Sequence, residues 1–137
     1  MNRIPLRVSD YMVSDLLTVT PDTEITQVVN VLIEHDMSGA LVVDQEGALV
    51  GIVTERDCIA VASSAGYYEE WGGPVSKYMS SPVEHVALDD NLVDVAVRMA
   101  SSPHRRFPVI DDGRLVGILT RREVLRALGS GSWFKVS

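Results

Sequence analysis

The chain contains an internal repeat that covers most of its length. The segment Val8-Ser9-Asp10-Tyr11-Met12 returns 67 positions later as Val75-Ser76-Lys77-Tyr78-Met79, and a one-residue deletion then changes the offset to 66, at which 47–57 aligns with 113–123. A supersecondary unit of this size is too small to bury its own apolar face. The two copies are therefore expected to fold against each other, with the interface between them available to a ligand.

Each copy predicts the same order of elements. A short helical turn, with Ser9 or Ser76 as its N-cap, is followed by a short strand, an amphipathic helix, a β-hairpin and a final helix. The predicted strands are 16–20, 40–44 and 49–53 in the first copy and 83–86, 107–111 and 115–119 in the second. The apolar helix faces are Ile25, Val28, Val29 and Leu32, and Leu92, Val95, Ala96 and Met99; the final helices are 55–61 and 121–128.

The order β-α-β-β-α predicts an α/β fold: two repeats packed by a pseudo-two-fold, each a small mixed sheet with helices on one face. We expect repeat 1 at 8–62, a linker at 63–74, repeat 2 at 75–128 and a C-terminal tail at 129–137. The linker aromatics Tyr67, Tyr68 and Trp71 either pack over the module edge or dock a partner. The tail, which carries Trp133 and Phe134, is expected to be mobile.

The net charge of −7 is unevenly distributed. Residues 1–73 carry 12 acidic and 3 basic side chains, whereas residues 74–137 carry 7 and 9. Overall acidity argues against a nucleic-acid-binding protein. No apolar run approaches the roughly 18 residues of a membrane span, the start lacks a secretory signal, and the single Cys58 cannot form an internal disulfide. These features predict a soluble protein of the reducing cytoplasm.

Three features together resemble a known family. These are the pattern Gly-apolar-apolar-Thr-x-x-Asp that opens the last helix of the first copy, a strand that ends in Pro-Val-apolar-Asp, and tandem duplication. Over roughly residues 8–128 the chain resembles a pair of cystathionine β-synthase (CBS) domains, or Bateman module, of the stand-alone type. The resemblance implies that adenosine compounds (AMP, ADP, ATP or S-adenosylmethionine) bind between the copies and regulate a partner protein.

Thr54 and Asp57, at the start of a final helix, support two interpretations. Thr120 and Glu123 match the Thr-x-x-Glu capping box, but Asp57 is one methylene shorter and fits that role less well. A carboxylate near a helix start also accepts hydrogen bonds from a ribose diol, and the Thr54 hydroxyl beside free backbone N–H groups suits a phosphate. Capping and ligand binding therefore both remain open.

The resemblance implies two unequal sites. In the main site Thr54 and Asp57 would face Arg105, Arg106 and Pro108, with backbone contacts to the base from the strand that begins at Val83. The weak second site would set Thr120 and Glu123 against Ser38 and Gly39, with Thr18 on the equivalent strand. Ser38 and Gly39 stand where the main site has its two arginines, so this site lacks positive charge.

Other assignments compete with this one. Arg105 and Arg106 could instead form surface salt bridges, which contribute little. The histidines lack metal-ligand spacing and no constellation indicates catalysis, so neither a metal site, a required cofactor nor an enzyme is predicted. The sequence favours a nucleotide-sensing regulatory module that acts as a homodimer on an unidentified protein. The alternative is an interaction or scaffold protein whose nucleotide sites have partly or wholly decayed.

Overall fold

The computed structural model describes residues 3–60, 72–130 and 134–136. Two compact units divide the chain: Met1–Leu16 joins Glu84–Ser137 in the first, hereafter unit 1, and Leu17–Val83 forms unit 2. Each unit is described by itself. The predictions for Tyr67, Tyr68, Trp71 and Trp133 lie outside the described residues.

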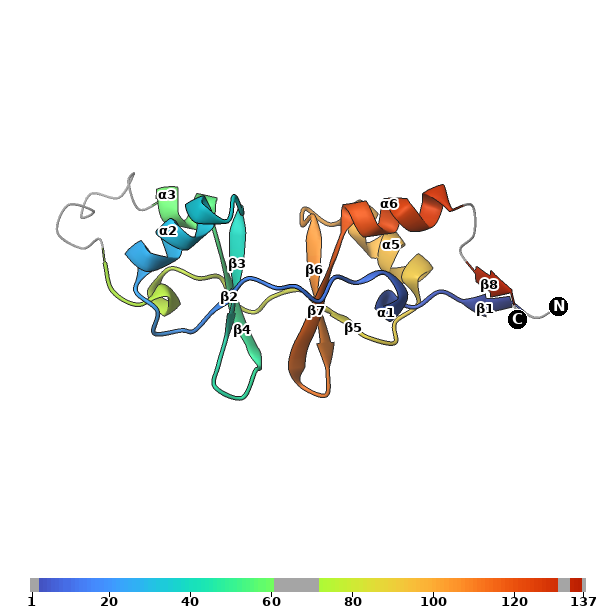
Figure 1. Ribbon diagram of the computed structural model, residues 1–137, viewed down its shortest axis with the longest axis horizontal. Helices are drawn as coiled ribbons and strands as arrows, with labels where there is room; N and C mark the ends of the chain where they lie inside the picture. The colour runs from blue at the N-terminus through green and yellow to red at the C-terminus, as the bar shows by residue number, and fades with distance from the viewer. Residues whose placement is uncertain (1–2, 61–71, 131–133, 137) are drawn as a thin grey trace. The chain divides into compact units, whose positions relative to one another are not determined.

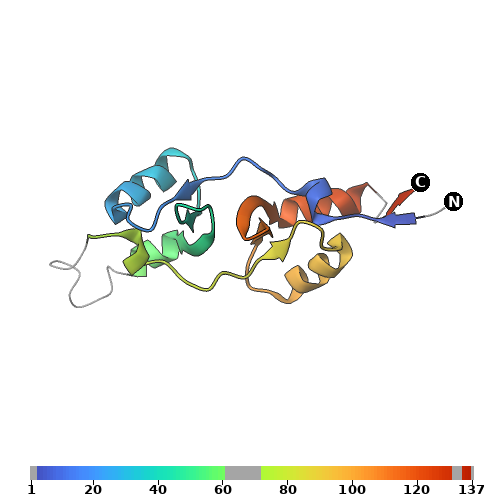
Figure 2. The same cartoon turned by 90° about the horizontal axis from the view of Figure 1, so that it is seen from below.

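Unit 2 holds a three-stranded mixed sheet with strand order β2-β3-β4, in which β2 runs parallel and β4 antiparallel to β3. Helices α2 and α3 lie next to each other on one side of this sheet (Figures 1 and 2). A buried cluster that includes Ile25, Val28 and Val53 fills the space between sheet and helices. The elements are β2 Thr18–Val19, α2 Ile25–Glu34, β3 Gly39–Val43, β4 Leu49–Thr54, α3 Glu55–Ala60 and the 3-10 turn η2 Val75–Lys77.

Unit 1 repeats this plan with the strand order β5-β6-β7 and with helices α5 and α6. The pairing register of the hairpin shifts at equivalent points in both units. The shift lies between Val42 and Val43 in the pairing of β3 with β4, and between Val109 and Ile110 in the pairing of β6 with β7. The elements are α1 Val8–Tyr11, β5 Val86–Ala87, α5 Leu92–Ser101, β6 Arg106–Asp111, β7 Arg114–Thr120 and α6 Arg121–Gly129; β1 Arg3–Pro5 pairs antiparallel with β8 Phe134–Val136. Two mixed sheets with helices on one face confirm the predicted fold class.

The short turns that open the repeats are exchanged between the units. Helix α1, from the start of repeat 1, lies among the elements of unit 1 (Figure 1). Its fully buried Val8 belongs to the core cluster formed by repeat 2, which includes Phe107 and Leu119. The equivalent Val75 is fully buried in the core formed by repeat 1. The compact units therefore interleave the sequence repeats.

Several local predictions are corrected by the structure. Ser9 and Ser76 are not N-caps, because they lie inside α1 and η2 and the cap positions belong to Arg7 and Pro74. The strands predicted at 16–20 and 83–86 shorten to two residues each, because ladder pairing with the next strand covers only Thr18–Val19 and Val86–Ala87. The backbone of 134–136 is a strand, which the expectation of a mobile tail missed.

Six of the eight residues predicted for the apolar helix faces are buried; in α5, Leu92, Val95 and Met99 are buried and Ala96 is partly buried against the same core. Ile25, Val28 and Leu32 are buried in α2, whereas Val29 is only half-buried and borders a surface pocket. Within the described residues, no helix combines the length and the apolar character needed to cross a bilayer.

Candidate functional site

The junction of β4 and α3 is held by a capping box between Thr54 and Asp57. The Asp57 Oδ2 atom accepts hydrogen bonds from the Thr54 backbone N–H at 2.8 Å and from Thr54 Oγ1 at 3.1 Å. The Asp57 N–H in turn donates to Thr54 Oγ1 at 3.2 Å. Asp57 was expected to fit this role less well than a glutamate, yet the half-buried Asp57 closes the box.

Capping uses only one of the two carboxylate oxygens of Asp57. The other, Oδ1, makes no hydrogen bond to any residue that the structure describes. An ionised carboxylate offers about four lone-pair sites, so Asp57 retains acceptor capacity after it has capped the helix. Capping and ligand binding are thus compatible at this residue.

Glu123 occupies the equivalent position in unit 1, in a different environment. Its Oε2 atom accepts hydrogen bonds from the Thr120 N–H at 3.1 Å and from the Thr120 hydroxyl. Only 7% of the surface of Glu123 is exposed, and among the described residues it is the one charged side chain that is buried. The same capping motif therefore leaves its carboxylate less accessible in unit 1 than in unit 2.

The two arginines of the predicted main site lie at the start of β6. The Arg105 carbonyl accepts a hydrogen bond from the Arg121 N–H at 3.1 Å, and Arg106 pairs with Thr120 across the ladder. The Arg105 side chain is exposed and forms no ion pair with a described carboxylate. Pro108 is buried and pairs with Ile118 across the ladder, between Phe107 and Val109, whose side chains belong to the core of unit 1.

Ser38 and Gly39 hold the equivalent positions in unit 2. The Ser38 carbonyl accepts from the Glu55 N–H at 2.9 Å, and Gly39 pairs with Thr54. A Cβ atom at Gly39 would lie 3.0 Å from the Val53 carbonyl oxygen, so the position favours a residue without a side chain. The start of β3 is therefore uncharged, whereas the start of β6 carries the guanidinium groups of Arg105 and Arg106.

The remaining predicted residues are placed as follows. Thr18 lies in β2 opposite Leu41 and is exposed, and Val83 lies outside any strand at the end of unit 2. Within unit 2 the structure brings Thr54 next to Gly39, and within unit 1 it brings Thr120 next to Arg106. Each predicted site draws residues from both units, so those groupings stay predictions.

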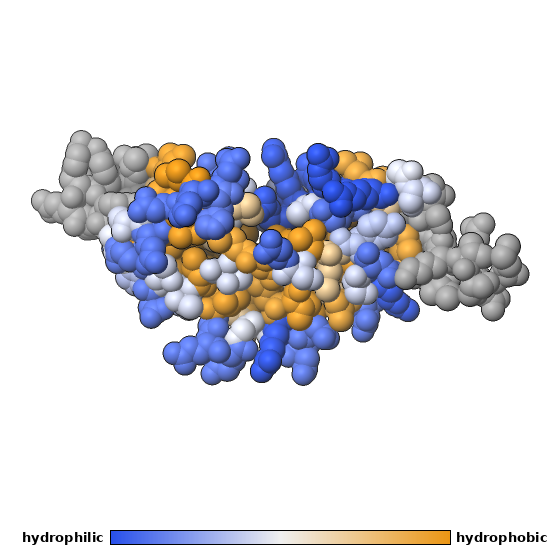
Figure 3. Space-filling model, viewed as in Figure 1, coloured by the Kyte–Doolittle hydropathy of each residue, from blue (hydrophilic) through white to orange (hydrophobic). Residues whose placement is uncertain are grey.

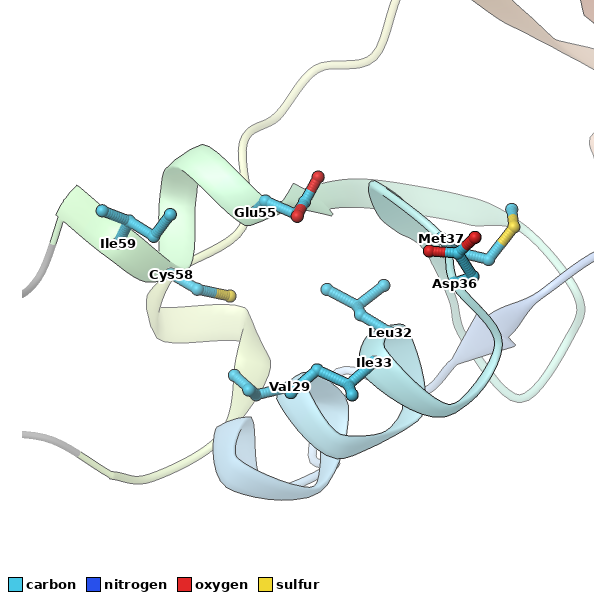
Figure 4. A pocket seen from close by; sticks show the side chains of 8 residues that line it. All are labelled: Val29, Leu32, Ile33, Asp36, Met37, Glu55, Cys58 and Ile59. Atoms are coloured by element: carbon cyan, nitrogen blue, oxygen red, sulfur yellow. The ribbon is translucent and has the colours of Figure 1, made fainter.

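A surface pocket in unit 2 was not predicted from the sequence. It occupies about 350 Å³ between α2 and α3, with Val29, Leu32 and Cys58 at its base and Asp36 and Glu55 at its edge (Figure 4). Burial raises the pKa of the Cys58 thiol, and the neighbouring carboxylates of Asp57 and Glu55 add to the shift. The signal that could have revealed it is Val29, an apolar residue at the margin of the α2 core face.

Comparison with known proteins gives the family. Residues 8–64 and 75–130 each match the CBS domain. The chain is 32% identical to the protein in the crystal structure of CBSX2 in complex with AMP, over 90% of this chain and 96% of that one, with a TM-score of 0.80; CBSX2 is a chloroplastic protein of Arabidopsis thaliana. It is 28% identical to the CBS domain pair of protein MJ0100, solved with 5′-methylthioadenosine and S-adenosyl-L-methionine, over 93% and 99% of the chains with a TM-score of 0.72.

A longer relative contains the same region as one part. The chain is 31% identical to inosine-5′-monophosphate dehydrogenase of Methanocaldococcus jannaschii over 88% of its own length, but it spans only 23% of that enzyme. The repeat, the paired sheets and the two family matches lead to one conclusion: the chain belongs to the CBS domain family and carries two copies of the domain.

Proposed function

We propose that this protein is a regulatory module that binds an adenine nucleotide and transmits its occupancy to a partner protein. In the main site Asp57 accepts the ribose hydroxyls, and Thr54, whose N–H and hydroxyl both donate to Asp57, holds that carboxylate in place. Arg105 with Arg106 neutralises the phosphate charge. Pro108 and the backbone near Val83 border the base. The module carries out no chemistry of its own.

The observation that carries the proposal is the second carboxylate oxygen of Asp57. It is unused by the capping box, while the carboxylate itself stays half-buried. A partly desolvated carboxylate with a vacant acceptor suits a sugar diol, because hydrogen bonds to charged groups are stronger than neutral ones. The similar CBSX2 and MJ0100 pairs were solved with adenosine-containing ligands, which supports the same ligand class here.

The second site is proposed to be weak. Glu123 is buried, and Ser38 and Gly39 supply no charge where the main site has arginines. A triphosphate bound there would lack a counter-charge at those positions. We therefore propose that nucleotide affinity depends little on the second site, which comprises Thr18, Ser38, Gly39, Thr120 and Glu123.

The state of assembly is part of the proposal. Helix residues Ile33, Ile59, Val97, Leu125 and Leu128 each expose between 48% and 73% of their surface. Burial of such side chains against a second copy is favourable at roughly 25 cal/mol per Å². We propose that the protein acts as a homodimer.

A thermal-shift panel of AMP, ADP, ATP, S-adenosylmethionine and NAD tests the proposed function. A ligand at 100 times its dissociation constant stabilises the folded protein by roughly 2.7 kcal/mol, which raises the melting temperature measurably. Adenosine compounds are expected to raise it, and guanosine and cytidine monophosphates serve as controls. If no adenosine compound raises the melting temperature at millimolar concentration, the interpretation as a scaffold with decayed sites replaces this one.

A further inference from the structure

A set of polar contacts in unit 1 joins the segment before β5 to the segment before β6. The Glu84 Oε1 atom accepts a hydrogen bond from the Ser102 hydroxyl at 3.0 Å, and Oε2 accepts one from the Arg98 guanidinium at 3.2 Å. Arg98 also donates to the His85 carbonyl at 3.2 Å, and the Ser102 Oγ atom accepts from the His104 N–H at 3.1 Å. Glu84, Arg98 and Ser102 are hereafter the Glu84 network.

Arg98 anchors this network to the sheet. Its guanidinium lies over the ring of Phe107, 5.3 Å from the ring centroid, and Phe107 is fully buried in the core of unit 1. A cation over an aromatic face is attracted by the ring. Phe107 directly follows Arg106 in β6. One side chain of α5 therefore contacts both the start of β6 and the segment before β5.

The first repeat has no such network among its described residues. Leu17 and Met37, at two of the equivalent positions, are partly buried and pack against the core of unit 2. The first repeat also has Ser38 and Gly39 in place of the two arginines. The polar network and the arginines therefore occur in the same repeat. In full, Leu17, Val31, His35 and Met37 correspond to Glu84, Arg98, Ser102 and His104.

The contribution of the Glu84 network to stability is expected to be small. The side chains of Glu84 and Arg98 expose 37% and 43% of their surface, and exposed ion pairs contribute little. The hydrogen bonds from Ser102 and from Arg98 lower the pKa of the Glu84 carboxyl, so the network is ionised at neutral pH. What these contacts fix is the position of one chain segment against another.

Both segments lead into the proposed nucleotide site. Residues 84–85 continue the backbone near Val83 that is assigned to the base, and Ser102 begins the stretch that leads to Arg105 and Arg106. The surface at this end of unit 1 is polar: hydrophilic side chains gather over the start of α6 in Figure 3, and the ladder places the start of β6 beside it. The Glu84 carboxylate thus connects a base-contacting segment with a phosphate-contacting segment.

We propose that Glu84 is a positioning residue for nucleotide specificity, which through Ser102 and Arg98 holds the phosphate-binding arginines at a fixed spacing from the base-contacting backbone. A segment that is already held in its binding geometry loses less conformational entropy when the ligand binds. Only a ligand with a phosphate gains from arginines held in this way, so the network favours a nucleoside phosphate over a nucleoside. The inference rests on the nucleotide site proposed above, and the three network residues all lie in unit 1.

Charge alone predicts the opposite effect of a substitution. If Glu84 acted on the ligand only through its negative charge, it would repel a phosphate, and Glu84→Gln would tighten AMP binding. If Glu84 holds the arginine segment, the same substitution loosens that segment and weakens AMP binding. The direction of the change therefore distinguishes the two roles.

Titration calorimetry with AMP and with adenosine on the full chain tests the proposal. The readout is the dissociation constant of adenosine divided by that of AMP. Glu84→Gln should lower this ratio about two- to tenfold, the equivalent of one hydrogen bond. Ser102→Ala should lower it to a similar extent, and the double variant should be no lower than Glu84→Gln, because both changes remove the same link. Ser102→Thr keeps the hydroxyl and should keep the wild-type ratio.

Asp112→Asn, in the β6–β7 turn, is the matched control. It also converts an exposed carboxylate to an amide, and asparagine tolerates the positive φ of 50° at this position. Its ratio should equal that of the wild type. Urea denaturation shows whether each variant is folded, and Ser102→Ala carries the test if Glu84→Gln does not fold.

The outcomes separate this inference from the proposed function. An unchanged or higher ratio in Glu84→Gln, with AMP binding intact in the wild type, overturns the positioning role and leaves the proposed function standing. Equal weakening of AMP and adenosine gives an unchanged ratio and overturns it too. A wild-type protein that binds neither ligand overturns the proposed function, and the positioning role with it.

Discussion

Val13 and Ile118 exchange both of their backbone hydrogen bonds, N–H to carbonyl at 2.9 Å in each direction. Ile52 and Ser80 do the same in the other unit, at 3.0 and 2.8 Å. In both places the residues that follow the Tyr-Met segment of one repeat pair with the hairpin of the other repeat. The recurrence of Tyr-Met therefore reflects a contact between repeats rather than one within each.

Gly117→Ala is expected to destabilise the protein by about 1–3 kcal/mol, because a methyl group there overpacks the contact with Met12. A Cβ atom at Gly117 would lie 2.7 Å from Met12 Sδ and 3.1 Å from the Val13 carbonyl oxygen. Gly129→Ala is the matched control, since nothing lies within 4 Å of its Cβ position. Equilibrium urea denaturation measures both, and equal stabilities for the two variants would contradict the close approach.

Asp57→Glu separates capping from ligand binding. It recreates the Thr-x-x-Glu sequence of the second repeat, so the helix cap is retained while the carboxylate moves by one methylene. Stability should change by less than about 1 kcal/mol, whereas Asp57→Ala should lose both roles and weaken AMP binding about ten- to a hundredfold. Titration calorimetry measures the AMP affinity of each variant, and urea denaturation measures its stability.

Glu123→Ala is the control for the site assignment. Loss of its cap should cost roughly 0.5–2 kcal/mol of stability with nucleotide affinity nearly unchanged. If AMP binding survives Asp57→Ala but disappears in Glu123→Ala, the two sites have been assigned to the wrong repeats.

Changing Arg105 and Arg106 together to Ala should weaken AMP far more than adenosine. Both arginines are assigned to the phosphate, and adenosine carries none. The readout is the ratio of the two dissociation constants, with Arg114→Ala in the β6–β7 hairpin as a control of equal charge type. Equal weakening of both ligands would place the arginines away from the phosphate.

Cys58 should react with iodoacetamide at a higher pH in the folded protein than in urea. Burial and the carboxylates of Asp57 and Glu55 raise the pKa of its thiol, so the thiolate fraction at a given pH is smaller. The folded state favours the protonated thiol, and this contribution to stability is lost as the pH rises through the raised pKa. Glu55→Gln should shift the alkylation midpoint downward, and Glu46→Gln, in the β3–β4 turn, should not.

The element order could be predicted because its signals are local. Ile25, Val28 and Leu32 follow the helical period, and the turn at Asp112 and Gly113, with φ values of 50° and 77°, joins two apolar strands as its Asp-Gly sequence indicates. The exchange of α1 and η2 between the repeats escaped prediction because it depends on long-range packing. Whether the short Asp57 side chain can accept a hydrogen bond from the Thr54 N–H depends on the backbone geometry at the start of α3. The spacing of the two residues in the sequence does not reveal that geometry.

The exchanged turns have a consequence for fragments of the chain. A fragment that holds only one repeat would carry Val8 or Val75 without the core in which that side chain is buried. Neither repeat cut out by itself is therefore expected to complete its own core, and the two must be present together for either compact unit to form.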